Sequence, residues 1–156
     1  MNFDAENEQL ILDAVDKFLI QIKPSVRQLE ADDEYPEEIV VQMKEMGLFG
    51  AVIDPEYGGL GLPVSVYAKI VEKIACVWMS LTGVFNSHLI MAMSVQRFGT
   101  EEQKRKWLPL FASGEMRGAL ALTEPNCGTD LQAIKSTAQL DGDEYIINGS
   151  KTWITN

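Results

Sequence analysis

The spacing of the apolar residues changes once along this chain, near residue 115, and that change restricts the possible folds. Before it, apolar residues recur every three to four positions, as they do on amphipathic helices. After it, two short runs alternate apolar and polar residues around Asp141-Gly142, which is the signal of a β-hairpin. Helices and strands that are separated along a sequence indicate the α+β class. We expect an all-α helical domain at residues 1–115 and the first strands of an antiparallel β-domain at 116–156.

Proline, glycine and capping residues divide the helical part of the sequence. Pro24 is expected to end the first helix, because proline removes a backbone donor inside a helix. Pro63 opens a later helix, and Thr100 with Gln103 forms the capping box of the last one, which Gly114 closes. The predicted helices cover residues 4–22, 25–32, 36–46, 63–80, 82–97 and 100–112.

The strand-forming part of the sequence is short. A brief apolar run, RGALAL at 117–122, precedes the hairpin, and SKTWITN at 150–156 follows it as a further strand candidate. A sheet of two or three strands leaves open edges and half of a core. We therefore expect this chain to be the N-terminal piece of a longer protein.

Charge and composition argue against several classes of partner. The net charge of −10 disfavours nucleic acid, which is bound through clustered Lys and Arg, and also disfavours anionic lipid surfaces. No apolar stretch approaches the ~20 residues of a membrane span, so no membrane partner is expected. Two cysteines without a CxxC motif, Cys76 and Cys127, cannot form a disulfide framework. With Cys76 expected as a buried free thiol, we expect the cytoplasm, or an organelle matrix if the source is eukaryotic.

The segment ALTEPNCGTD, residues 121–130, lies where the helical pattern gives way to the strand pattern. Pro125 and Gly128 indicate a turn, and Thr123 and Thr129 place hydroxyl groups beside it. Backbone N–H groups in such a turn can bind phosphate oxygens, and Gly128 allows a ligand to approach the backbone closely. From the residues alone, a phosphate site and an ordinary tight turn both remain open, because the segment matches neither GxGxxG nor a Walker motif.

The same segment closely resembles the flavin-binding signature of the acyl-CoA dehydrogenase family. Three further stretches resemble landmarks of that family in the same order: PEYGGLG at 55–61, FGTEEQKRKWLPLFASGE at 98–115 and DEYIINGSKTWITN at 143–156. The resemblance implies a fragment of a three-domain fold, with an N-terminal helical domain, a middle domain that is an antiparallel β-barrel, and a C-terminal helical domain. This chain would supply the first domain and the start of the second.

The resemblance also implies roles for individual residues. Leu122 by its backbone and Thr123 by its hydroxyl would meet the flavin ring, and Gly128 and Thr129 would hold the FAD pyrophosphate. Trp153 would pack on the flavin. The implied cofactor-binding residues are Leu120, Leu122, Thr123, Gly128, Thr129, Trp153, Ile154 and Thr155, and the implied substrate-binding residues are Leu81, Val84, His88 and Thr129.

Cys127 departs from the family pattern, which usually has Ala, Gly, Ser or Asn at this position. Because cysteine is also small, cofactor binding is expected to survive this departure. The thiol would be oxidisable beside the cofactor.

The implied reaction is FAD-dependent α,β-dehydrogenation of an acyl-CoA thioester, with electrons passed to an electron transfer flavoprotein. The base would be a Glu of the C-terminal domain, so no catalytic residue is assigned here and the chain alone is expected to be inactive. Glu124 and Asp130 are interpreted as structural residues whose carboxylates accept hydrogen bonds from backbone N–H groups of the turn. His88 fits a position in the core as well as one that contacts the acyl chain. No metal site is expected, and the full-length protein is expected to be a homo-oligomer, either a tetramer or a dimer.

Two alternatives stay open at this point. One keeps the superfamily but changes the chemistry, to an acyl-CoA oxidase or a flavin monooxygenase. The other is a non-catalytic helical interaction module whose β-extension binds nothing.

Overall fold

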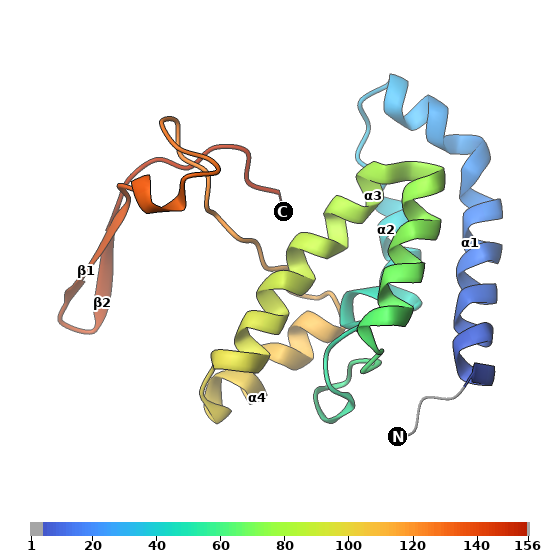
Figure 1. Cartoon of the computed structure of the whole chain (residues 1–156), viewed down its shortest axis with the longest axis horizontal. Helices are drawn as coiled ribbons and strands as arrows, with labels where there is room; N and C mark the ends of the chain where they lie inside the picture. Colours follow the sequence, from blue (N-terminus) through green and yellow to red (C-terminus); the bar gives the residue numbers. More distant parts are fainter. Residues whose placement is uncertain (1–4, 156) are drawn as a thin grey trace.

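The computed structural model of this chain describes residues 5–155, so the predicted helix start at residue 4 and the last predicted strand position, Asn156, lie outside the described residues. A helical unit comes first, and a slender β-part follows it (Figure 1). The helical unit consists of α1 (Ala5–Ala31), α2 (Glu37–Glu45), η1 (Leu48–Gly50), η2 (Pro55–Tyr57), α3 (Val64–Phe98) and α4 (Glu101–Ala112).

The core of the helical unit lies where α1 and α4 pack against α3. Apolar side chains at helical spacing on each element point into it, and the removal of each large one from water stabilises the fold by about 1.5–3 kcal/mol. Buried residues of α2 and η1 belong to the same core, and η1 contacts α2, α3 and α4. The largest fully buried apolar side chains are Phe49, Phe85, Met43, Leu48, Ile53, Ile70, Ile74, Leu81, Leu89, Leu108 and Val15.

Pro24 does not end the first helix, which corrects the prediction. α1 continues through Pro24 to Ala31, and the short helical stretch predicted at 25–32 belongs to it. Ile22 and Val26, on either side of the proline, are both buried in the core. We attribute the continuation to this packing, which offsets the one backbone hydrogen bond that the proline removes.

The two helices predicted at 63–80 and 82–97 form one long element, α3, that is interrupted at Trp78. The backbone of Trp78 is non-helical, with φ −153° and ψ 96°. Its side chain is buried, and its indole N–H donates to a Glu30 carboxylate oxygen at 2.8 Å. The predicted division of this region is therefore confirmed, and it falls at Trp78.

The length and apolar composition of α3 correct the prediction that no apolar stretch approaches the length of a membrane span. Among the described residues it alone is long and apolar enough to cross a membrane, with a mean hydropathy of 1.4 over an 18-residue window. Length and composition do not separate a membrane helix from the core helix of a soluble protein, and 33% of that window is buried inside this fold. The absence of a membrane partner stays a prediction.

Cys76 is exposed, contrary to the prediction of a buried thiol. The first half of α3 turns Ile70, Ile74 and Trp78 into the core. These residues are four positions apart and so share one helix face, which leaves residue 76 on the other side.

The β-part is a two-stranded antiparallel hairpin, β1 (Thr137–Asp141) and β2 (Glu144–Asn148), with Asp141 opposite Glu144 at the turn. Gly142 has a φ of 62°, a conformation that glycine adopts at little cost. The hairpin extends away from the helices (Figure 1). The hairpin prediction is confirmed. The strand candidate at 150–156 does not form a strand within the described residues 150–155, and the apolar run at 117–122 does not form one either.

Candidate functional site

The segment at 121–130 forms the tight turn that its proline and glycine indicate. The backbone N–H of Glu124 donates to the Cys127 carbonyl at 2.9 Å, and the N–H of Cys127 donates to the Glu124 carbonyl at 3.1 Å. Pro125 and Asn126 occupy the tip. Gly128 and Thr129 follow directly and are both exposed, so the predicted phosphate-binding residues lie on an open surface.

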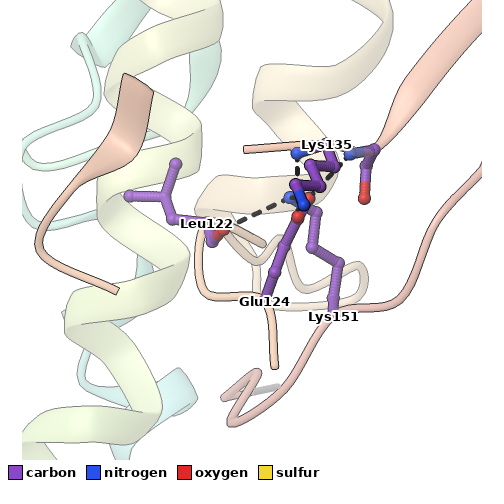
Figure 2. Close-up of polar contacts among 5 residues, drawn as sticks. Leu122, Glu124, Lys135 and Lys151 are labelled. Atoms are coloured by element: carbon purple, nitrogen blue, oxygen red, sulfur yellow. Dashed lines mark hydrogen bonds and ion pairs between the residues drawn. The ribbon is translucent and has the colours of Figure 1, made fainter. Parts of the chain in front are cut away.

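Glu124 connects this turn to two other segments (Figure 2). Its carboxylate accepts hydrogen bonds from the backbone N–H groups of Lys135 at 2.8 Å and Ser136 at 2.9 Å, and from the Lys151 ammonium at 2.9 Å. Hydrogen bonds from Ser136, from the Lys135 N–H and from Lys151 lower the pKa of Glu124 to about 2. Glu124 thus bonds backbone N–H groups as expected, but these belong to residues 135 and 136 and not to the turn itself.

Asp130 has a local role of the same kind. One of its carboxylate oxygens accepts from the backbone N–H of Gln132 at 3.2 Å, which caps the short helix η3 (Leu131–Ala133). This hydrogen bond agrees with the structural interpretation of Asp130.

The two segments that the resemblance assigns to the flavin lie side by side. The Thr152 backbone N–H donates to the Thr123 carbonyl at 3.0 Å, and the Lys151 ammonium donates to the Leu122 carbonyl at 3.2 Å. Residues 122–123 therefore contact residues 151–152, directly before Trp153. The farther end of this second segment approaches α3. The Thr155 methyl carbon lies 4.0 Å from the point where a Cβ on Gly83 would stand.

The surface around these two segments fits a flavin dinucleotide. Leu120, Leu122 and Trp153 expose 44%, 36% and 90% of their surface, so apolar side-chain surface that would suit a planar ring is open to solvent. Apart from Gly128 and its two neighbours in the sequence, no heavy atom of the described residues lies within 4 Å of a Cβ placed on Gly128, so a ligand can reach that backbone. Thr123 is half-buried beside the turn, and Ile154 is half-buried beside Trp153.

His88, the single histidine, is fully buried between α3, η1 and α4. Its Nδ1 accepts from the Gly118 backbone N–H at 3.2 Å, so the proton of the neutral ring lies on Nε2. Nε2 faces the carbonyl oxygens of Phe49 at 3.1 Å and Phe111 at 3.0 Å. Burial lowers the pKa of His88, and the hydrogen bonds to these carbonyls oppose that shift. The core interpretation is confirmed, whereas contact with substrate stays a prediction.

The other two predicted acyl contacts, Leu81 and Val84, lie together. Leu81 is fully buried and Val84 is half-buried, and both line a cavity of about 640 Å³ between α3 and the end of α1. Trp78 and Tyr35 line the same cavity. His88 does not line it, so the three predicted acyl contacts do not all line one cavity.

No group of three or more metal-ligating side chains occurs within residues 5–155. The sequence interpretation missed Lys151, which contacts both Leu122 and Glu124. A buried carboxylate requires a cationic or N–H partner, but the sequence alone shows neither that Glu124 is buried nor that Lys151 meets it.

Comparisons with known proteins follow the same division of the chain. The family model described as "Acyl-CoA dehydrogenase, N-terminal domain" matches residues 5–115, and the one described as "Acyl-CoA dehydrogenase, middle domain" matches residues 119–156. A short-chain specific acyl-CoA dehydrogenase of Clostridium acetobutylicum is 39% identical over 159 aligned positions, which cover 100% of this chain and 42% of that protein. The chain thus spans less than half the length of this relative.

Solved structures agree in fold. An acyl-CoA dehydrogenase of Bacillus anthracis in complex with FAD superposes with a TM-score of 0.85 at 35% identity, over 99% of this chain and 27% of that chain. A structure described as an electron transferring flavoprotein of Acidaminococcus fermentans gives 0.90 at 37% identity, over 99% of this chain and 41% of that chain.

Proposed function

The chain belongs to the acyl-CoA dehydrogenase family, and from this premise we propose that the protein containing it oxidises an acyl-CoA thioester at the α,β-position with FAD. The observation that carries the proposal is the pairing of Thr152 with Thr123. It brings together two segments that would each meet the flavin, although the hairpin separates them in the sequence. The relative from Bacillus anthracis, solved with FAD, supports the choice of cofactor.

Residues of both segments would hold the cofactor. The Leu122 backbone and the Thr123 hydroxyl would meet the ring, with Trp153 packed on it and Thr155 at its polar edge. Gly128 and Thr129 would hold the pyrophosphate, because an open backbone beside a hydroxyl suits phosphate oxygens. Leu120 and Ile154 would flank the ring as apolar neighbours.

When bound, FAD supplies the hydride acceptor for this class of oxidation. The chain's own residues bind and orient the cofactor and exclude water from one side of it. We assign no base among residues 1–156 and expect it in the part of the protein that relatives have beyond this chain. We propose an electron transfer flavoprotein as the electron acceptor, as the resemblance to the family implies.

Leu81 and Val84 are the proposed contacts of the acyl chain, since both line the cavity beside α3. Thr129 would lie near the CoA portion of the substrate. His88 would act on the substrate only through the packing of α3, because both of its ring nitrogens already bond to backbone groups.

The remaining features of the proposal concern the whole protein. We propose residues 1–115 as the N-terminal helical domain and 116–156 as the start of the middle β-domain. A homo-oligomer, tetramer or dimer, is the proposed assembly, and the cytoplasm or an organelle matrix the proposed location. Two free cysteines, one of them exposed, are consistent with a reducing compartment.

The test uses the complete protein that contains this chain, purified with its flavin and kept anaerobic. Its visible spectrum is recorded during titration with a panel of short, branched, long-chain, aromatic and dicarboxylic acyl-CoA thioesters. We expect one class to bleach the flavin, with electrons then passing to an electron transfer flavoprotein. A flavin that no thioester bleaches would contradict the proposed reaction. Rapid peroxide release in air would instead indicate an oxidase, and a complete protein without flavin would indicate the interaction module.

A further inference from the structure

Glu124 and Lys151 lie inside the candidate flavin site, but neither residue has an assigned contact with the flavin. We propose that they form a positioning pair, which keeps the Leu122–Thr123 backbone in register with residues 153–155 and thereby sets how tightly FAD is bound. This inference rests on the proposed function, because it concerns the same site. Figure 2 shows the arrangement.

Lys151 makes the contact between the two segments. Its ammonium lies 3.2 Å from the Leu122 carbonyl oxygen and 2.9 Å from Glu124 Oε1, while its side chain is 26% exposed. An ammonium has three N–H donors, so it can bond both acceptors at once. The position of the Leu122 carbonyl is thus held by a hydrogen bond from a charged group, in addition to its covalent backbone geometry.

Glu124 keeps that ammonium in place. The Glu124 side chain is only 7% exposed, and its carboxylate also accepts the N–H groups of Lys135 and Ser136, which lead into β1. An ionised carboxylate out of water requires such partners, and loss of one leaves the other charge uncompensated. The pair therefore joins three stretches of chain: the turn, the start of β1 and the segment at 151–155.

The charge pair and a backbone hydrogen bond act in parallel. Lys151 contacts residue 122 by its side chain, and Thr152 contacts Thr123 by its backbone N–H. Trp153 and Thr155 lie two and four residues after Lys151, so a shift at residue 151 displaces the proposed ring contacts on that side. Hydrogen bonds at two successive positions fix both the distance between the segments and their register. One hydrogen bond alone would leave the register free to shift.

Glu124 is poorly suited to the alternative role of proton transfer. Its hydrogen bonds favour the ionised form and lower its pKa to about 2, whereas a general base works best with a pKa near the operating pH. Its two oxygens are already occupied by three donors. The arrangement fits positioning better than chemistry.

The test compares Lys151→Met, Glu124→Gln, the double variant, and the conservative Lys151→Arg in the complete protein. Lys135→Met is the matched control, because it removes an exposed lysine of the same region while leaving intact the Lys135 N–H that bonds Glu124. The readouts are the dissociation constant of FAD from the apoprotein, the visible flavin spectrum, and hydrogen exchange at the Thr152 amide.

We expect Lys151→Met and Glu124→Gln each to weaken FAD binding by about 10- to 100-fold and to shift the flavin spectrum. The Thr152 amide should exchange faster in both, and the double variant should lose much less than the product of the two effects, since the residues act as a unit. Lys151→Arg should restore most of the affinity, and Lys135→Met should match the wild type.

Unchanged affinity, spectrum and exchange in Lys151→Met would overturn the positioning pair while leaving the proposed function intact. A wild-type protein that binds no FAD would instead refute the proposed function, and Thr152 exchange would then decide alone whether the pair aligns the two segments. If Lys151→Met does not fold, Glu124→Gln compared with the control gives the same decision, since the glutamine keeps the size of the side chain.

Discussion

The backbone N–H of Thr152 donates to the carbonyl oxygen of Thr123 at 3.0 Å, on the far side of a hairpin that separates them in sequence. This bond aligns two segments that otherwise share no strand pairing. Within residues 5–155, the two segments of the candidate flavin site are joined by this backbone hydrogen bond and by the Lys151 side chain next to it.

Removing the Thr152 N–H should weaken cofactor binding in the complete protein. Thr152→Pro deletes a donor worth about 1 kcal/mol, which corresponds to roughly a fivefold higher dissociation constant for FAD. Thr152→Val keeps the N–H and is the control. Fluorescence titration of the apoproteins measures both, and equal constants for Pro and Val would show that this hydrogen bond does not position the site.

Ionisation of Glu124 should be visible in the amides that bond to it. Hydrogen bonds lower the pKa of this carboxyl from 4.5 to about 2 in the folded chain. The ionised carboxyl therefore contributes its full stability above about pH 4.5. Below that pH the unfolded chain binds a proton while the folded chain does not, so the contribution declines. It is lost as the pH falls through about 2. We expect the Lys135 and Ser136 amide proton shifts to titrate near pH 2, and not to titrate in Glu124→Gln. A midpoint near 4.5 would contradict the network.

His88 should be a strong determinant of stability. His88→Phe keeps an aromatic ring but removes the donor to Phe49 and Phe111 and the acceptor for Gly118. Unsatisfied buried groups of this kind cost about 2–4 kcal/mol in total. Urea denaturation of the chain measures the loss, and the exposed Met79→Ala serves as a control that should change stability by less than about 0.5 kcal/mol.

The same histidine gives stability a pH dependence. Burial lowers the pKa of His88 below its ordinary value of 6.5, so the unfolded chain binds a proton before the folded chain does. Stability should be complete above about pH 6.5 and should fall as pH decreases below it. In His88→Phe the stability should not show this decrease below about pH 6.5. Identical slopes for both proteins between pH 5 and 7 would count against the buried neutral ring.

The capping box of α4 offers a smaller and well-defined effect. The Thr100 hydroxyl accepts from the Gln103 N–H at 3.2 Å, and the Gln103 side chain accepts from the Thr100 N–H at 2.9 Å. Thr100→Ala should lower the free energy of unfolding by about 1 kcal/mol, whereas Thr100→Ser should retain most of it. Equal stability of the Ala and Ser variants would show that the cap contributes nothing.

Local signals in the sequence predicted the elements that depend on local chemistry. The Thr100–Gln103 cap and the hairpin turn at Gly142 follow from a few adjacent residues, and the structure has both. The break near residue 80 was also predicted, although its position at Trp78 depends on a contact with Glu30 from another helix.

The features that the sequence did not reveal depend on tertiary packing. Pro24 stays within α1 between the buried Ile22 and Val26, and Cys76 is exposed because of the face that α3 buries. The partnership of Glu124 with Lys151 could not be read from spacing, because the hairpin lies between them. The resemblance identified the candidate flavin segments, and the structure shows which atoms join them.

The most direct test of the account is flavin binding by the complete protein with Thr123→Ala and Gly128→Val introduced separately and together. The first removes the hydroxyl proposed to meet the ring, and the second fills the space beside the proposed phosphate site. We predict that the double variant folds, with a thermal transition close to that of the wild type, but purifies with little FAD. Full flavin occupancy in the double variant would contradict the assignment of this turn as the cofactor site.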